Sequence, residues 1–444
     1  MPPKSDPSFI EIDKNYSKNN RIKVCVIGAG AAGLVNARLY KSRPDIFDVT
    51  VFEKGNEVGG TWVYNEKTGV HSSMYKSLKT NLPLSIMQFS DYACDIDKQG
   101  FVSHEDVLQY LKGYCCHFNL RPLIHFHHEV LNVKRMAKSA SSSREWLVKV
   151  RDILTNQSRE EYFDSVLVCN GRYSKPKIPV VKGVKLFNGK VRHVHDYRTP
   201  DEYAGQRIAV LGAGPSGTDI SLELASVADE VFLCHNLPEL YPNMPNNITQ
   251  ISSSIASLDG NRVIMKTGQV LDDIDTVFFA TGYDFDFGFL DKSCGIELAE
   301  EGGRVKDLYL HLVNAKYPSM AIWAVTCKVI PFPFYEIQAA FFMKVMMGEV
   351  VLPSRQEMIQ ETEEDFDLRL SMGIPARHAH EMATKQLLWS YEERLVSTAK
   401  IQGIKPVFRD LYTQLFQIRQ EHTAEYKNWD FVIVNDYEFH CIKK

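Results

Sequence analysis

The segment IKVCVIGAGAAGL, residues 22–34, decides the fold class. An apolar run of strand length leads directly into Gly28, Gly30 and Gly33, and an apolar helical pattern follows. In a dinucleotide-binding unit the first glycine permits a tight turn and the second lets the backbone approach a pyrophosphate. The third lets the helix pack closely against the strand, and the start of the helix offers N–H groups to phosphate. The segment therefore predicts a Rossmann-like unit.

An acidic residue follows the next predicted strand. The segment FDVTVFEK, residues 47–54, predicts that strand, and Glu53 follows the glycines at about the 20-residue distance at which a carboxylate binds ribose hydroxyls. Gly59 and Gly60 come shortly afterwards and predict a second close approach of backbone to the same ligand, with Trp62 as a flat neighbour. This arrangement favours FAD over NAD as the first ligand.

The strand, glycine and helix pattern then starts again. RIAVLGAGPSG, residues 207–217, carries Gly212, Gly214 and Gly217, with Ser216 at the helix start. The later run DTVFFATGY echoes DSVLVCNGRY of the first block. We predict an α/β protein with two Rossmann-like domains, the second inserted into the first. The predicted segments are 1–173 and 284–444 for the FAD-binding domain, the latter with C-terminal helices, and 174–283 for the NADPH-binding domain.

The second unit lacks the acid. Its second strand ends in Cys234 and then His235, so nothing there repels a 2′-phosphate, which favours NADP over NAD. With Cys234 in the place of the ribose-binding carboxylate, an aspartate at that position is expected to shift the preference toward NADH. No arginine follows that would bind the phosphate. His235 is a candidate for that contact, although a histidine there is more often an ordinary residue at a strand end.

Composition restricts the class of protein. The chain has 444 residues and a formal net charge of -4, which gives no electrostatic basis for binding nucleic acid. No apolar run is long enough to cross a bilayer, and the N-terminal residues lack the apolar core of a signal peptide. The nine cysteines include no C-x-x-C pair, which favours a reducing compartment. We expect a soluble cytoplasmic protein, with a secreted form whose signal has been removed as the alternative.

Two histidines near the second fingerprint raise the question of a metal site. In FNGKVRHVHDYR, residues 187–198, the candidate ligands are His193, His195 and Asp196. A metal site needs a further ligand that the surrounding sequence does not supply. We therefore expect no metal, and another explanation for the spacing of this segment is required.

The spacing Phe187-x-Gly189-xxx-His193-xxx-Tyr197 resembles the identifying motif of the flavin-containing monooxygenases. The segments FEKGNEVGGTW, SLKTNLP, VLGAGPSGTD, FFATGY and VIPFPFYEIQAAF also match family features in family order, so the resemblance extends from about Lys23 to Pro353. The length of the chain makes it most similar to the soluble insect and fungal members. By this resemblance His193 is structural or interdomain.

The resemblance implies two cofactors, FAD and NADPH, and an enzymatic reaction. In such enzymes NADPH reduces the flavin, O2 adds to form a C4a-hydroperoxide, and an amine nitrogen or a sulfur of a small molecule takes an oxygen atom. Asn81 is the implied catalytic residue, and a homo-oligomer is compatible with the family. The implied FAD contacts are Gly28, Gly30, Gly33, Glu53, Gly60, Thr61, Trp62, Thr80, Asn81, Gln338 and the backbone near Val130, and the implied NADPH contacts are Gly212, Gly214, Ser216, Gly217, Thr218 and Asp219.

Two other functions stay open at this point. A Baeyer–Villiger monooxygenase uses related machinery on ketones, but its motif typically ends in tryptophan where this chain has Tyr197. A non-catalytic FAD- and NADPH-binding sensor would keep both folds without turnover. Among substrates, the insect members suggest N-oxygenation of pyrrolizidine alkaloids, a hypothesis that rests on analogy alone.

Overall fold

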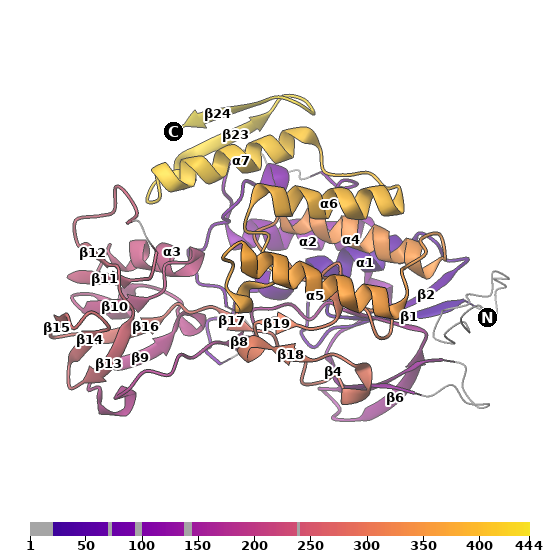
Figure 1. Cartoon of the computed structure of the whole chain (residues 1–444), viewed down its shortest axis with the longest axis horizontal. Helices are drawn as coiled ribbons and strands as arrows, with labels where there is room; N and C mark the ends of the chain where they lie inside the picture. Colours follow the sequence, from indigo (N-terminus) through magenta and orange to yellow (C-terminus); the bar gives the residue numbers. More distant parts are fainter. Residues whose placement is uncertain (1–20, 70–72, 94–99, 137–143, 238–239) are drawn as a thin grey trace.

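The structure is a computed structural model that describes residues 21–69, 73–93, 100–136, 144–237 and 240–444 (Figure 1). Residues 1–20, for which the sequence predicts no signal peptide, lie outside the described residues. Two separate sheets with parallel cores organise the chain. Among the described helices, none has both the length and the apolar composition needed to cross a membrane.

The first sheet has seven strands in the order β20-β21-β22-β7-β1-β2-β3. Strand β1 pairs in parallel with β2 and β7, and the central strand β7 also pairs in parallel with β22 from much later in the chain. Helix α1 (Ala31–Lys41) follows β1 directly. The strands are β1 (Ile22–Ile27), β2 (Phe47–Phe52), β3 (Ile124–His125), β7 (Ser165–Val168), β20 (Leu308–Tyr309), β21 (Val313–Asn314) and β22 (Met320–Ile322).

The second sheet is built entirely from residues between β7 and β22. Its five parallel strands have the order β12-β11-β10-β16-β9, and helix α3 (Pro215–Leu224) follows β10. The predicted α/β class, with the second nucleotide-binding unit inserted into the first, is confirmed. The strands are β9 (Lys190–His193), β10 (Arg207–Leu211), β11 (Glu230–Cys234), β12 (Ile248–Ile251) and β16 (Thr276–Phe279).

Smaller antiparallel sheets cover each unit and the connections between them. The strand β8 on the way into the second unit pairs with β17 on the way out, so the two connections lie side by side. The meander β4-β5-β6 shares a core with the first sheet, and β13-β14-β15 shares one with the second. These strands are β4 (His128–Arg135), β5 (Trp146–Asp152), β6 (Ser158–Phe163), β8 (Lys175–Pro176), β13 (Ile255–Asp259), β14 (Arg262–Met265), β15 (Val270–Leu271), β17 (Tyr283–Asp284), β18 (Leu298–Ala299) and β19 (Arg304–Val305).

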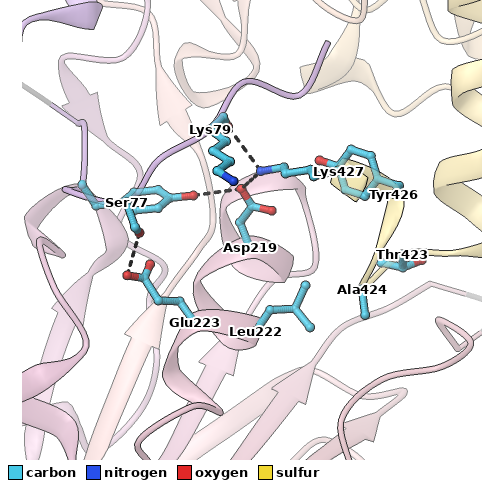
Figure 2. Close-up of a pocket in the computed structure, with 10 residues that line it drawn as sticks. Ser77, Lys79, Asp219, Leu222, Glu223, Thr423, Ala424, Tyr426 and Lys427 are labelled. Carbon is cyan, nitrogen blue, oxygen red and sulfur yellow. Dashed lines mark hydrogen bonds and ion pairs between the residues drawn. The ribbon is translucent and has the colours of Figure 1, made fainter. Parts of the chain in front are cut away.

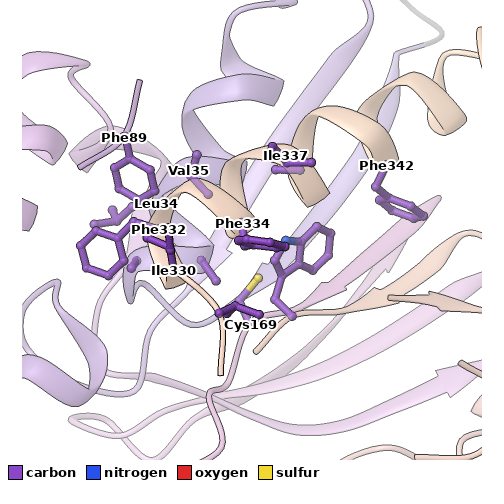
Figure 3. Close-up of a cluster of buried hydrophobic side chains, with 14 of the residues drawn as sticks. Leu34, Val35, Phe89, Cys169, Ile330, Phe332, Phe334, Ile337 and Phe342 are labelled. Carbon is purple, nitrogen blue, oxygen red and sulfur yellow. The ribbon is translucent and has the colours of Figure 1, made fainter. Parts of the chain in front are cut away.

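The largest core lies between α1 and the late helices. Helix α4 is apolar on most of its surface, so it is buried on several sides, and Figure 3 shows its Phe334, Ile337 and Phe342 in the same buried cluster as Leu34 and Val35 of α1. The C-terminal part, with α7 and a hairpin, lies along one edge of the molecule in Figure 1. The remaining elements are α2 (His104–His117), α4 (Pro331–Met346), α5 (Arg355–Ser371), α6 (Lys385–Ala399), α7 (Pro406–Glu421), β23 (Trp429–Ile433) and β24 (Phe439–Lys443).

His193 connects the end of β9 to the chain that leaves the second sheet. Its Nδ1 accepts a hydrogen bond from the backbone N–H of His195 at 3.0 Å, so Nε2 carries the proton and donates to the carbonyl oxygen of Gly282 at 3.0 Å. Burial lowers the pKa of His193 to about 4. Both ring nitrogens are engaged by backbone, which leaves neither for a metal, and the described residues contain no cluster of three or more His, Cys, Asp or Glu side chains that could hold one.

We expect His193→Ala to lower the free energy of unfolding by about 1–3 kcal/mol, because the buried N–H of His195 and the partly exposed carbonyl of Gly282 both lose their partner. Folding favours the neutral imidazole, so its stabilising contribution is complete above about pH 6.5 and is lost as the pH falls toward 4. His193→Gln keeps a donor and an acceptor without titrating, and should lose less stability and lack this part of the pH dependence.

Denaturant unfolding between pH 4 and pH 8 measures both effects, and the exposed His440 provides the control variant His440→Ala. Equal stability of His193→Ala and His440→Ala would contradict the structural role. One equivalent of bound metal, with stability lost on chelation, would restore the metal hypothesis.

Candidate nucleotide-binding and catalytic site

The end of β1 and the start of α1 form a cradle that only glycine permits. A methyl group on Gly33 would lie 1.9 Å from the carbonyl oxygen of Gly28, and Gly28 itself has φ +103°. Gly30 caps α1 without a side-chain hydrogen bond, so the first N–H groups of the helix are not capped by a side chain. These N–H groups suit an anionic diphosphate, and the cradle therefore fits the phosphates of a dinucleotide.

A second glycine segment closes over this cradle. The N–H of Gly59 donates to the carbonyl of Ala29 at 3.0 Å, and a methyl group on Gly60 would lie 2.9 Å from the Cα of Gly30. The two backbones thus approach each other in the way predicted for a shared ligand. Thr61 and Trp62 continue this segment as a single 3-10 turn and are partly exposed.

Glu53 lies directly after β2 and is 6% exposed. Its carboxylate accepts hydrogen bonds from the N–H groups of Ala29 and Gly55, both at 2.7 Å, so it is fixed beside the fingerprint loop. The N–H of His128, at the start of β4, donates to the carbonyl of Glu53 at 2.9 Å. Val130 lies two residues further along β4, at a bulge in its pairing with β5. Its contact with FAD remains a prediction.

The second unit repeats the first cradle closely. A methyl group on Gly217 would lie 2.0 Å from the carbonyl oxygen of Gly212, whereas a methyl group on Gly214 would meet only open space. Ser216 is exposed in the first turn of α3. The hydroxyl of Thr218 donates back to the carbonyl of Gly214 at 3.1 Å, which stiffens the loop from within.

The register of the two sheets corrects the alignment of the two units. The N–H of Gly28 donates to the carbonyl of Phe52, and the N–H of Gly212 donates to the carbonyl of Cys234, both at 2.8 Å. Cys234 is therefore the counterpart of Phe52, and His235 is the counterpart of Glu53. The prediction that Cys234 stands at the ribose-binding position was wrong by one residue.

The environments of the two residues agree with this correction. Cys234 is completely buried in the core between the second sheet and the β13-β14-β15 meander, and burial raises its pKa to about 12. His235 is 3% exposed, and its Nδ1 accepts a hydrogen bond from the N–H of Leu237 at 3.2 Å. Its Nε2 is buried, and Gln250 is a polar side chain that interacts with the ring. Tyr241, whose hydroxyl donates to the carbonyl of Ala213 at 2.8 Å, lies between His235 and the fingerprint loop.

Thr80 and Asn81 follow a short bridge between residues 79 and 103. Thr80 is buried, and both its backbone N–H and its hydroxyl oxygen bind the backbone of Val102, at 2.8 and 3.1 Å. This double contact fixes the backbone from which the Asn81 side chain projects. Asn81 is partly buried, and its Oδ1 accepts a hydrogen bond from the hydroxyl of Tyr426 at 3.1 Å.

Two other predicted cofactor residues make contacts within the protein. Gln338 is buried in α4, where its Nε2 donates to the hydroxyl of Tyr391 at 2.8 Å and its Oε1 has no partner among the described residues. Asp219 accepts a hydrogen bond from Tyr75 at 2.9 Å and pairs with Lys427 at 2.5 Å. Their contacts with FAD and NADPH remain predictions.

A cavity of about 200 Å³ lies beside Asp219, between residues 75–79, α3 and residues 423–427 (Figure 2). Its floor is polar, because the hydroxyl of Ser77 donates to Glu223 at 2.6 Å next to the Tyr75–Asp219–Lys427 group. Tyr426 and Lys427 could not be predicted from the sequence, since no motif precedes or follows them.

Two cradles, each with a helix start and a glycine loop, define a protein that binds two dinucleotides. The sequence model of the flavin-binding monooxygenase-like family matches residues 21–238 and 238–412. The chain belongs to the flavin-containing monooxygenase family, with FAD and NADPH as cofactors, which confirms the predicted family, enzyme class and cofactors.

The relatives match over most of their length. Flavin-containing monooxygenase FMO GS-OX-like 7 of Arabidopsis thaliana is 33% identical over 433 residues, covering 92% of this chain and 91% of that protein. The structure of S-allyl-L-cysteine S-oxygenase from Allium sativum is 30% identical, with a TM-score of 0.82 over 92% of this chain and 95% of that one. Cyclohexanone monooxygenase from Rhodococcus sp. Phi1, bound to NADP+, shares the fold at 15% identity, with a TM-score of 0.60 over 86% of this chain and 98% of that one.

We expect His235→Asp to lower the preference for NADPH over NADH by at least about tenfold, because a carboxylate there repels the 2′-phosphate. The aspartate oxygen can accept from Leu237 as Nδ1 does, so the loop should be kept. The ratio of kcat/KM for the two coenzymes in flavin reduction, together with the Kd of NADP+, measures the change.

Cys234→Ser is the matched control, since this side chain faces the core and should not alter coenzyme preference. A shift in Cys234→Ser as large as that in His235→Asp would contradict the corrected register. Equal use of both coenzymes by the unaltered protein would contradict the preference itself.

Proposed function

We propose that this enzyme transfers one oxygen atom from O2 to a soft nucleophilic heteroatom of a small molecule, at the expense of NADPH. The preferred acceptor is a thioether sulfur, and a tertiary amine nitrogen is the second candidate. The observation that supports sulfur is the likeness, over nearly the whole chain, to an S-oxygenase at 30% identity and a TM-score of 0.82. N-oxygenation of a pyrrolizidine alkaloid is the narrower form of the amine hypothesis.

The cofactors supply the redox chemistry, because reduced flavin activates O2 with electrons from NADPH. The protein supplies binding and orientation. The start of α1 and the facing Gly59–Gly60 backbone would hold the FAD phosphates, with Glu53 on the ribose. The start of α3, including Ser216, would hold the NADPH phosphates, and His235 would lie by the adenosine ribose.

Asn81 is the proposed catalytic residue of this site. Its amide offers a donor and an acceptor without a proton that titrates near neutral pH. Thr80 fixes its backbone through two contacts with Val102, so the amide is preorganised. We propose that the Asn81 amide holds a reacting oxygen in a site from which water is excluded.

The expected acceptors need no general acid or base, because a thioether or a tertiary amine already carries a free electron pair. Tyr197, the position at which Baeyer–Villiger enzymes typically have tryptophan, is fully buried against Tyr203 and Phe278. Oxidation of ketones is therefore the alternative that a substrate panel must include.

The eight cysteines within the described residues are all free, which supports the proposed cytoplasmic location.

The proposal is tested with a panel of a methyl thioether, an acyclic tertiary amine, a pyrrolizidine alkaloid and a cyclic ketone. Product mass after turnover in ¹⁸O2 identifies both the acceptor and the source of the oxygen. We expect one labelled oxygen in the sulfoxide and a higher kcat/KM for the thioether than for the amines. A labelled ester from the ketone as the main product would favour a Baeyer–Villiger monooxygenase instead. Binding of FAD and NADPH without turnover of any compound in the panel would favour a sensor.

We expect Asn81→Ala to bind FAD and oxidise NADPH but to release H2O2 in place of oxygenated product. Loss of one positioned donor costs about 3 kcal/mol in the transition state, so oxygenation should fall by a factor on the order of 100. The ratio of product to NADPH consumed is the measurement. Asn188→Ala, at an exposed position of the inserted unit, is the control and should leave the ratio unchanged. An unchanged ratio in Asn81→Ala would show that the residue only shapes the loop.

A further inference from the structure

Residues 423–427, which we name the C-terminal clamp, contact both nucleotide-binding units. They follow α7 and lie beyond residue 412, where the match to the family model ends. Figure 2 shows Tyr426 and Lys427 of this clamp at the cavity beside Asp219 of α3. These two side chains therefore lie outside the part of the chain that the family model matches.

Tyr426 is held tightly inside the protein. It is 3% exposed, and its ring packs edge-on against Phe101 with centroids 5.3 Å apart. The guanidinium of Arg419, in the last turn of α7, lies 5.4 Å from the ring centroid. Burial raises the pKa of the Tyr426 phenol, so the hydroxyl stays protonated at neutral pH and can donate to the Oδ1 of Asn81 at 3.1 Å.

Lys427 connects the C-terminal clamp to the segment that carries Asn81 by a hydrogen bond. Its Nζ donates to the carbonyl of Lys79, two residues before Asn81, at 3.2 Å. The same Nζ pairs at 2.5 Å with Asp219 of α3, and both side chains are less than one-fifth exposed. The ion pair thus joins residues 79–81, the clamp and the inserted unit, and it fixes the distance over which Tyr426 reaches Asn81.

The hydrogen bond from the Tyr426 hydroxyl to Asn81 determines which end of the Asn81 amide, the oxygen or the NH2 group, is left free for another partner. An asparagine amide has one oxygen and one NH2 group, and rotation about its last torsion exchanges them at low cost. Because the oxygen is taken by the hydroxyl of Tyr426, the NH2 group points away from the clamp. Within the described residues, that NH2 group donates to no acceptor on the protein.

We propose that Tyr426 is a positioning residue that fixes the orientation of the Asn81 amide, so that its NH2 group is the one offered to the reacting oxygen. This proposal rests on the proposed role of Asn81. Without the hydroxyl both orientations of the amide are populated, and the fraction of reduced enzyme that oxygenates substrate falls. The same change raises the fraction that releases H2O2.

Tyr426→Phe tests the proposal because it removes the hydroxyl and keeps the ring against Phe101. We expect unchanged FAD content and Tm, continued NADPH oxidation, and a ratio of product to NADPH that is lower by about three- to tenfold, the range for loss of one neutral hydrogen bond. Tyr437→Phe is the matched control, since Tyr437 is 77% exposed in the β23–β24 turn, and its ratio should not change.

The double variant Asn81→Ala/Tyr426→Phe separates positioning from an independent effect. If Tyr426 acts through Asn81, the double variant is no more uncoupled than Asn81→Ala alone. A further fall in the double variant, or an unchanged ratio in Tyr426→Phe while Asn81→Ala is uncoupled, would overturn the proposal. An unchanged ratio in Asn81→Ala would instead refute the catalytic role on which it rests.

A spectroscopic measurement reports the orientation without turnover. In the holoprotein labelled with ¹⁵N-asparagine, the side-chain NH2 signals of Asn81 are identified by their loss in Asn81→Ala. We expect these signals to shift or broaden in Tyr426→Phe and to be unaffected in Tyr437→Phe. Identical Asn81 signals in the unaltered protein and in Tyr426→Phe would overturn the proposal.

Discussion

The close contact between a helix and the strand before it is the constraint on which the rest of the structure depends. At Gly33 and at Gly217 there is no room for even a methyl group, because the carbonyl oxygen of the first glycine lies about 2 Å from where it would be. The contact brings the start of the helix down to the loop, so uncapped N–H groups and a bare backbone face one point. The chain meets this condition twice, which commits it to two dinucleotides.

The insertion of the second unit creates the next requirement, which is to hold two nucleotide sites at a fixed distance. The polar interactions at this junction join residues that are far apart in the sequence. His193 bonds to Gly282 at the exit from the second sheet, and β8 pairs with β17 where the connections pass each other. On the other side, Asp219 of α3 is tied to Lys427. Each contact pairs polar groups that satisfy one another, so each favours one geometry of the junction.

Local signals predicted the fold, and tertiary signals were needed for the details of the site. Glycine spacing and apolar runs are local, so both cradles, Glu53 and the insertion could be predicted. The assignment of Cys234 failed because a run of apolar residues does not show at which residue a strand ends. The hydrogen bond from the N–H of Gly212 to the carbonyl of Cys234 does show it. Tyr426 could not be found, because its contact with Asn81 spans 345 residues and no sequence motif surrounds it.

The polar groups around Asn81 share a chemical property that follows from their burial. The phenol of Tyr426 has a raised pKa and remains a donor, and the hydroxyl of Thr80 does not titrate. The charge on Lys427 is paired with Asp219 at the cavity, and its Nζ also donates to the Lys79 carbonyl. The amide is therefore held by a neutral hydrogen bond, while the Lys427–Asp219 ion pair is attached to the backbone of Lys79, two residues before Asn81. In the role proposed for Asn81, this arrangement would direct a donor at the reacting oxygen without placing an acidic proton next to it.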